Sequence, residues 1–158
     1  MGLDASVYCD CFERGKLHTQ PKHEWNVCVD EYGGRTANPT NEDDIFSFDD
    51  WDINACEHEF GKLLHHRIGN IALVGLLREE LSKASEQFPI ILSRVIWSGT
   101  HCGDKIEVAL LPALRCEIDS LSNFQPTEPT SNLYIQQFKT QISELIDAAL
   151  KVKKPIVF

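Results

Sequence analysis

Eight carboxylates within twenty residues are the first feature of this sequence that could do chemistry. Residues 42–61 hold no Lys or Arg. The acidic residues there are Glu42, Asp43, Asp44, Asp49, Asp50, Asp52, Glu57 and Glu59. Like charges this close repel one another and destabilise the chain unless something compensates them. The acidic segment is therefore either a solvated helix face or an electrostatic docking surface for a basic protein.

A calcium loop is a further interpretation of the same carboxylates. Asp50, Asp52 and Asn54 match the first three ligand positions of an EF-hand. Ala55 then occupies the position that needs glycine, and Gly61 the position that needs a bidentate glutamate. These two mismatches exclude an EF-hand.

Cysteine and histidine side chains form the second candidate site, because zinc takes three or four such ligands. The weak candidates are Cys56, His58, His65, His101 and Cys102, with Cys9-x-Cys11 able to join them through space. On a helix, Cys56 and His58 would point about 200° apart and could not easily share a metal. The chain has no C-x₂-C or H-x₃-H spacing. The spacing therefore favours structural thiols, and we assign no metal and no cofactor.

Nucleophilic catalysis needs a general base within hydrogen-bond reach of a Cys or Ser. His101 stands beside Cys102 and near Ser98, but no G-x-S-x-G turn or phosphate-binding glycine loop surrounds them. The sequence therefore predicts no catalytic residue. The runner-up hypothesis is a small metal-dependent or cysteine enzyme using His58, His65, His101 and Cys102.

Composition limits the classes of partner. The net charge is −9, and residues 42–61 alone contribute −8. Nucleic-acid binding is not expected, because it relies on basic surface. The longest apolar run, residues 71–77, is far shorter than the roughly 18 residues of a membrane span. No secretory signal is visible at the start, so we expect a cytoplasmic protein with reduced thiols.

Hydrophobic periodicity predicts strands at both ends of the chain and helices between them. Residues 5–12 and 24–31 read as strands, and residues 36–42, with Asn38-Pro39, as a loop. A helix is predicted over 46–60, with Ser47 as its N-cap and Phe48, Trp51 and Ala55 facing inward.

The second half of the chain is predicted to be mostly helical. Residues 68–84 follow a helical stripe, with Asn70 as a candidate cap and Arg67 free to pair with the acidic segment. Residues 90–97 fit either a helical turn or a strand, and 105–110 are weakly strand-like. Helices follow over 112–121 and 131–152, and the apolar tail 155–158 should join the sheet or pack on it.

These elements predict an α+β fold in one globular domain, residues 1–158. A small mixed or antiparallel sheet would pack with about four helices.

Three segments resemble a group of small, uncharacterised bacterial proteins. They are the start Met1-Gly2-Leu3-Asp4, the loop Ser98-Gly99-Thr100-His101-Cys102-Gly103-Asp104, and the final helix running into Lys154-Pro155-Ile156-Val157-Phe158. The resemblance brings no activity with it. Small acidic bacterial proteins of this type are often immunity proteins for secreted toxins, so it implies that class by analogy of type alone.

The leading hypothesis is an acidic protein-binding module, an immunity-type inhibitor of a basic partner such as a toxin enzyme. Its partner-binding residues would be Asp43, Asp44, Asp49, Asp50, Trp51, Asp52, Glu57 and Glu59. Trp51 or Phe48 would anchor the partner if exposed, as aromatic residues often do at interfaces. A regulatory domain that could form a homo-oligomer is the third hypothesis.

Overall fold

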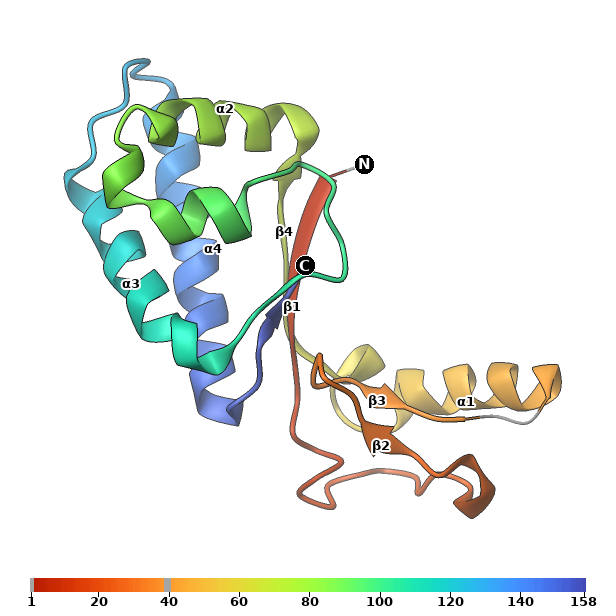
Figure 1. Ribbon diagram of the computed structural model, residues 1–158. Helices are drawn as coiled ribbons and strands as arrows, with labels where there is room; N and C mark the ends of the chain where they lie inside the picture. The colour runs from red at the N-terminus through yellow and green to blue at the C-terminus, as the bar shows by residue number, and fades with distance from the viewer. Residues whose placement is uncertain (1, 39–40) are drawn as a thin grey trace.

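A four-stranded antiparallel sheet forms the centre of the computed structural model, which describes residues 2–38 and 41–158 (Figure 1). Its order is β4-β1-β6-β5. The strands are β1 (Gly2–Tyr8), β4 (Lys62–Asn70), β5 (Lys105–Ile106) and β6 (Ile156–Val157). β1 and β4 pair along their whole length, from Gly2 opposite Asn70 to Tyr8 opposite Lys62. This long pairing places the end of β1 beside the start of β4.

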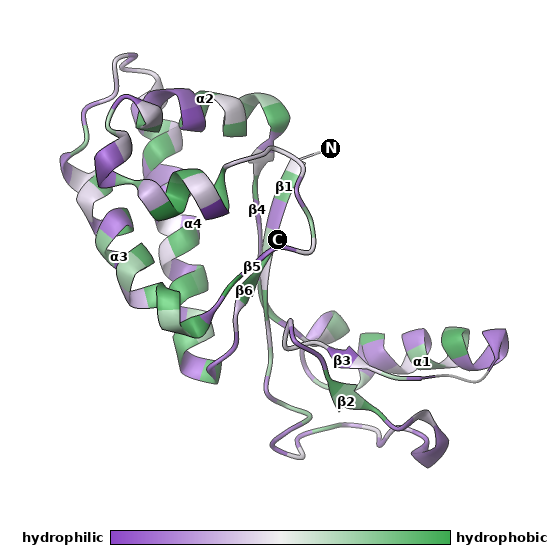
Figure 2. Cartoon of the chain, viewed as in Figure 1, coloured by the Kyte–Doolittle hydropathy of each residue, from purple (hydrophilic) through white to green (hydrophobic). Residues whose placement is uncertain are grey.

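Three helices pack together to one side of the sheet and enclose the main hydrophobic core (Figure 1). They are α2 (Ile71–Ser82), α3 (Leu111–Ser120) and α4 (Ser131–Val152). Short helical turns connect them, including the π-helical Ile91–Val95. Alternate residues of β1, Leu3, Ala5 and Val7, are buried in the same core. Hydropathy follows this arrangement, with apolar stripes on α2, α3 and α4 (Figure 2).

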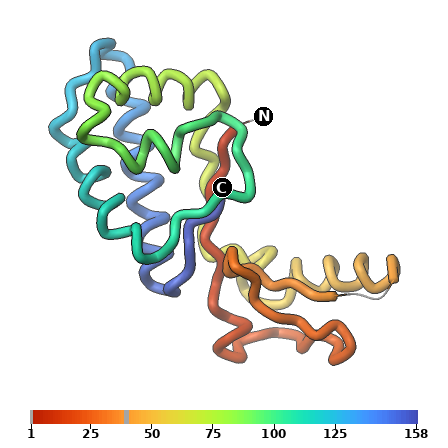
Figure 3. The backbone as a smooth tube through the Cα atoms, viewed as in Figure 1, coloured from red at the N-terminus to blue at the C-terminus, as the bar shows by residue number. Residues whose placement is uncertain are grey.

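The N-terminal lobe, residues 9–61, lies beyond the end of the β1–β4 pair, away from the three-helix layer (Figure 3). It contains the hairpin β2 (Cys28–Val29) and β3 (Arg35–Thr36), and helix α1 (Glu42–Asn54). Short 3₁₀ turns span His23–Trp25 and Glu59–Gly61. Its buried apolar residues are Cys9, Cys11, Trp25, Ala55 and Cys56. Three of these five are cysteines, so the described part of the lobe has very little core of its own.

The predicted α+β class, the antiparallel sheet and the four helices are confirmed. Helix 131–152 and the strand in the C-terminal tail are also confirmed. Helix 112–121 is nearly right, since α3 begins and ends one residue earlier. Of the predicted 36–42 loop, Pro39 and Thr40 lie outside the described residues. Among those described, no helix is long and apolar enough to cross a membrane.

The prediction for α1 was wrong at both ends. The helix begins at Glu42 because the side chain of Asn41 accepts a hydrogen bond from the Asp44 backbone N–H and caps it. Ser47 is no cap, because its hydroxyl donates to the Asp43 carbonyl within the helix. The helix ends at Asn54, so Cys56 and His58 lie outside it.

The predicted 68–84 helix was also wrong at its start. Residues 68–70 belong to a strand, Lys62–Asn70, that was not predicted, and the helix begins at Ile71, three residues later than expected, and ends at Ser82. The Asn70 cap is confirmed, since its side chain accepts from the Leu73 N–H. Arg67 pairs with Asp4 at 3.7 Å and not with the acidic segment.

The remaining strands are shorter than predicted. β1 covers residues 2–8 rather than 5–12, because the chain turns from Cys9 onward. Only 28–29 of the predicted 24–31 strand pairs with a neighbour, and only 105–106 of 105–110. Residues 90–97 take the helical alternative.

Replacing Phe138 by Ala should lower the free energy of unfolding by about 3–5 kcal/mol, because it empties a fully buried position of α4. Leu133→Ala on the same helix is the matched control. Its side chain is 72% exposed, so the loss should be below about 0.5 kcal/mol. Urea unfolding measures both, and equal losses would contradict the core described above.

Glu80 should make stability depend on pH. A hydrogen bond from Lys83, and a second from the Thr127 backbone N–H, hold the pKa of this carboxyl below its ordinary 4.5. A lowered folded-state pKa stabilises the fold above pH 4.5, and that contribution is lost as the pH falls further.

Glu80→Gln should therefore be less stable than wild type at pH 7, and the difference should shrink below pH 4.5. Urea unfolding at a series of pH values measures it. The exposed neighbour Glu79→Gln should show no such trend, and a gap that stays constant with pH for Glu80→Gln would disprove the assignment.

Candidate docking helix and thiol–imidazole cluster

Aromatic packing fixes the inner face of α1. Phe48 and Trp51 contact Trp25 with ring centroids 5.8 and 6.0 Å apart, and each other at 5.6 Å. The Trp51 indole N–H donates to the Thr19 carbonyl at 2.9 Å. Aromatic contacts of this geometry add to the free energy of burial. They therefore set which side of α1 turns away from the lobe.

The outer face of α1 is open to solvent. No residue of the helix is buried, and Phe46 and Ile45 leave 70% and 46% of their surface exposed. Helical spacing places Phe46 on the same side as Asp49 and Asp50, three and four residues later. Both carboxylates are exposed, as are Glu42 and Asp43 in the first turn. An exposed phenylalanine thus lies among several carboxylates.

The predicted docking residues divide between the two faces. Asp43, Asp49 and Asp50 lie outward, and Glu57 and Glu59 are exposed beyond the helix. The other three predicted residues, Asp44, Trp51 and Asp52, face inward. Asp44 accepts from the Trp25 indole and lies 3.8 Å from Lys22, while Asp52 is paired with Arg35. The exposed aromatic side chain of the helix is Phe46, which the sequence interpretation passed over.

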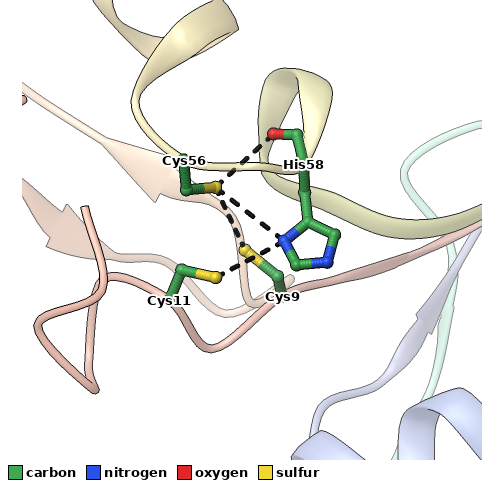
Figure 4. A group of neighbouring side chains, drawn as sticks. All are labelled: Cys9, Cys11, Cys56 and His58. Carbon is green, nitrogen blue, oxygen red and sulfur yellow. Dashed lines mark hydrogen bonds between the residues drawn. The ribbon is translucent and has the colours of Figure 1, made fainter. Parts of the chain in front are cut away.

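Three thiols and one imidazole converge at the base of the lobe (Figure 4). The ligand atoms of Cys9, Cys11, Cys56 and His58 all lie within 4.8 Å of one another. Sγ of Cys9 is 3.8 Å from Sγ of Cys56, and Nδ1 of His58 is 3.4 Å from Sγ of Cys11 and 4.0 Å from Sγ of Cys56. All three cysteines are buried. We call these four residues the thiol–imidazole cluster.

Strand pairing explains why residues 47 positions apart meet here. Cys9 directly follows β1, and its N–H donates to the carbonyl of Gly61, the residue before β4. The chain then turns, with the Lys16 N–H donating to the Cys11 carbonyl. Cys56 and His58 lie in the bend between α1 and β4. Each short Cys-x-Cys or Cys-x-His pair therefore lies where one strand of an antiparallel pair meets the lobe.

The objection that Cys56 and His58 cannot share a ligand applied only to a helix. Because α1 ends at Asn54, the two residues lie in non-helical chain and their side chains converge. The other candidates lie elsewhere. His65, on β4, hydrogen-bonds Ser6 at 2.9 Å, and His101 is buried against the Val95 carbonyl at 2.9 Å and Asp104. Cys102 is exposed.

The three thiols have unequal acidity. Burial, together with hydrogen bonding and charge from Cys9 and Cys56, raises the pKa of Cys11 to about 12, and burial also raises the pKa of Cys9. Burial acts the same way on Cys56, but hydrogen bonds with the His58 backbone and Arg35 outweigh it and lower its pKa. Cys56 is therefore the thiol whose anion this environment stabilises.

Arg35 links the cluster to α1. Its side chain is only 5% exposed, and Nη1 donates to Sγ of Cys56 at 3.4 Å. Nε donates to the Asp52 carboxylate at 2.5 Å and Nη2 to the Asp52 carbonyl at 2.8 Å. One guanidinium thus joins β3, the last turn of α1 and a cysteine. Nothing in the local sequence pattern around Arg35 predicted this role.

Arg35→Gln should lower the free energy of unfolding of the lobe by about 3 kcal/mol, because it leaves the Asp52 carboxylate largely buried without its cation. Trp25 and Trp51 report on the lobe in near-ultraviolet circular dichroism during urea unfolding. Arg67→Gln removes an exposed ion pair of similar type and should cost less than about 1 kcal/mol. Equal effects of the two substitutions would refute the role given to Arg35.

No protein-family model, curated protein or solved structure matches this chain. The resemblance to small bacterial proteins therefore stays a prediction.

Proposed function

We propose that the chain is an acidic protein-binding module whose docking surface is the outer face of α1. The observation that supports this most directly is the exposed Phe46 beside the carboxylates of Asp49 and Asp50. Ile45, the neighbour of Phe46, is also exposed, at 46%, so two adjacent apolar side chains lie among these carboxylates. An exposed apolar patch, rather than a single exposed residue, points to an interaction site. An apolar anchor within a charged rim is the usual anatomy of a protein interface.

The charge of the lobe specifies the chemistry of the partner. Residues 42–61 contribute −8 of the net −9, and no Lys or Arg lies among them. Such a local field attracts cationic surfaces and raises association rates by roughly 10–10³-fold. The partner is therefore a basic protein that offers an apolar socket for Phe46. An inhibitor of a basic toxin enzyme needs such an acidic surface with an apolar anchor. The specific function proposed for this chain is therefore that of an immunity-type inhibitor.

The same geometry refines the set of partner-binding residues. Phe46 replaces Trp51 as the anchor, since Trp51 is held inward by Trp25 and Thr19. Asp49 and Asp50 remain, while Asp52 is already neutralised by Arg35. Inner and outer residues of α1 therefore differ in role, the first holding the helix and the second meeting the partner.

The enzyme alternative has less support. It requires His58, His65, His101 and Cys102 to work together, but they belong to different parts of the fold. His65 pairs with Ser6 on the sheet, His101 packs between Trp97 and Phe158, and His58 lies in the thiol–imidazole cluster.

A synthetic helical peptide of Lys and Leu, with its leucines on one face, is a suitable probe for the docking surface. Phe46→Ala should weaken its binding by at least about 10-fold, because the anchor is removed. Asp49→Lys with Asp50→Lys should slow association by about 10-fold at low salt and much less at high salt. Surface plasmon resonance at two salt concentrations measures both.

The matched charge control is Glu79→Lys with Glu86→Lys, which reverses two exposed carboxylates outside the lobe. It should leave association almost unchanged. A peptide of Lys and Ser with the same charge should bind more weakly than the Lys–Leu peptide. If Phe46→Ala bound the probe as tightly as wild type, or if both control and test reversals slowed binding equally, α1 would have no docking role.

A further inference from the structure

We propose that Cys9, Cys11, Cys56 and His58 bind one structural Zn²⁺ that fastens the N-terminal lobe to the sheet. This inference is independent of whether α1 binds a partner. It is built on the distances within the thiol–imidazole cluster, the chemistry of its ligand set, and the lack of another core in the lobe.

The distances match a tetrahedral metal site. Zinc–sulfur bonds of about 2.3 Å and zinc–nitrogen bonds of about 2.0–2.1 Å place two sulfurs about 3.8 Å apart, and sulfur and nitrogen about 3.6 Å apart. The Cys9–Cys56 sulfur separation is 3.8 Å, and the two separations from Nδ1 of His58 are 3.4 and 4.0 Å. The remaining pairs of ligand atoms lie within 4.8 Å of one another, so small side-chain adjustments would bring all four atoms to bonding distance of one ion.

The ligand set selects zinc and a structural role. Three thiolates and one imidazole are soft ligands suited to Zn²⁺ and poorly suited to Mg²⁺ or Ca²⁺. Four protein ligands complete a tetrahedron and leave no position for water or substrate, which distinguishes structural from catalytic zinc. The runner-up hypothesis of a metal-dependent enzyme is therefore not what this cluster supports.

The surroundings compensate the charge of such a site. Zn²⁺ with three thiolates carries one net negative charge, because three anionic ligands exceed its two positive charges. Arg35 donates to Sγ of Cys56, and the buried ammonium of Lys154 donates to the Cys9 carbonyl. Cations and N–H donors around metal-bound sulfur stabilise the thiolate form. A pocket of ≈ 200 Å³ is lined in part by Cys9, Cys11 and His58.

The lobe needs a cross-link of this kind. Most of the buried apolar residues of the chain belong to the main core outside the lobe, and Trp25 and Ala55 are the described buried apolar residues of the lobe that are not cysteine. Small folds with so little buried surface usually depend on a metal or a disulfide. The zinc would link Cys9 and Cys11, which precede the hairpin and α1 in the sequence, to Cys56 and His58, which follow them.

Metal content of the reduced, untagged protein tests the inference. Elemental analysis should find one zinc per chain after purification, and again after chelation and back-titration. Cobalt should substitute with the absorption of a tetrahedral thiolate complex. Cys9→Ser, Cys56→Ser and His58→Ala should each lower zinc affinity by at least about 10-fold, whereas His58→Cys should retain the ion.

Two controls separate a built site from adventitious thiol binding. The triple variant Cys28→Ser, Cys102→Ser and Cys116→Ser removes the three exposed thiols and should keep one zinc per chain. Arg35→Gln should lower zinc affinity by about 10–100-fold through the Cys56 sulfur, and Arg67→Gln should not.

The result that overturns the inference is absence of stoichiometric metal from the exposed-thiol triple variant under reducing conditions. Equal zinc binding by that variant and by its Cys9→Ser derivative would overturn it too. If a ligand variant fails to fold, titration of the triple variant with a chelator tests the inference instead. Loss of zinc must then coincide with loss of the near-ultraviolet circular dichroism signal of Trp25 and Trp51. The Lys–Leu peptide plays no part here, so failure of the docking proposal and failure of the zinc proposal are distinguishable.

Discussion

The convergence of three thiols and an imidazole where β1 and β4 meet the lobe is the constraint on which the rest of this structure depends. The main core holds itself together through buried apolar surface supplied by the sheet and three helices. The lobe cannot, because three of its five described buried apolar residues are the cysteines themselves. Its geometry therefore depends on the aromatic contacts of Trp25 with α1, on the polar contacts of Arg35 and on the thiol–imidazole cluster at its base.

That constraint explains why an acidic helix can project from the fold. Repulsion among the carboxylates of α1 opposes its folding, and the helix buries none of its residues to offset this. Its position is set by Trp25 and Thr19 on one side and by Arg35 at its end. Holding the helix from its inner face leaves Phe46 and the outward carboxylates free to meet a partner. Two further hydrogen bonds hold the turn of the β2–β3 hairpin. Lys105 donates to the Glu31 carbonyl, and Lys154 donates to the Gly33 carbonyl.

The sequence predicted an element correctly where its buried residues form a long, regular pattern. The periodicity of 131–152 marked α4 correctly because nearly every third or fourth residue there is buried. It failed at β4, where alternation of Leu64, His65 and His66 is weak and the polar run resembled a loop before a helix. The decisive local signal was Asn70, whose capping role was recognised although the strand before it was not.

The thiol–imidazole cluster could be predicted only in part from the sequence. The sequence contains both Cys9-x-Cys11 and Cys56-x-His58, which the fold brings together. A helix extending to residue 60, as the sequence predicts, would point Cys56 and His58 apart. Asn41 as the N-cap corrects only the start of the helix, and it is the end at Asn54 that removes the objection. Arg35 could not have been found this way, because its partners Asp52 and Cys56 are distant in sequence and are met only through the hairpin.

Amide hydrogen exchange with and without a zinc chelator, in reduced protein, tests most directly whether the thiol–imidazole cluster holds the lobe. Chelation should accelerate exchange strongly in α1 and in the β2–β3 hairpin while α4 keeps its protection, because the main core does not need the ion. Unchanged protection of α1 after the metal is removed would contradict this account.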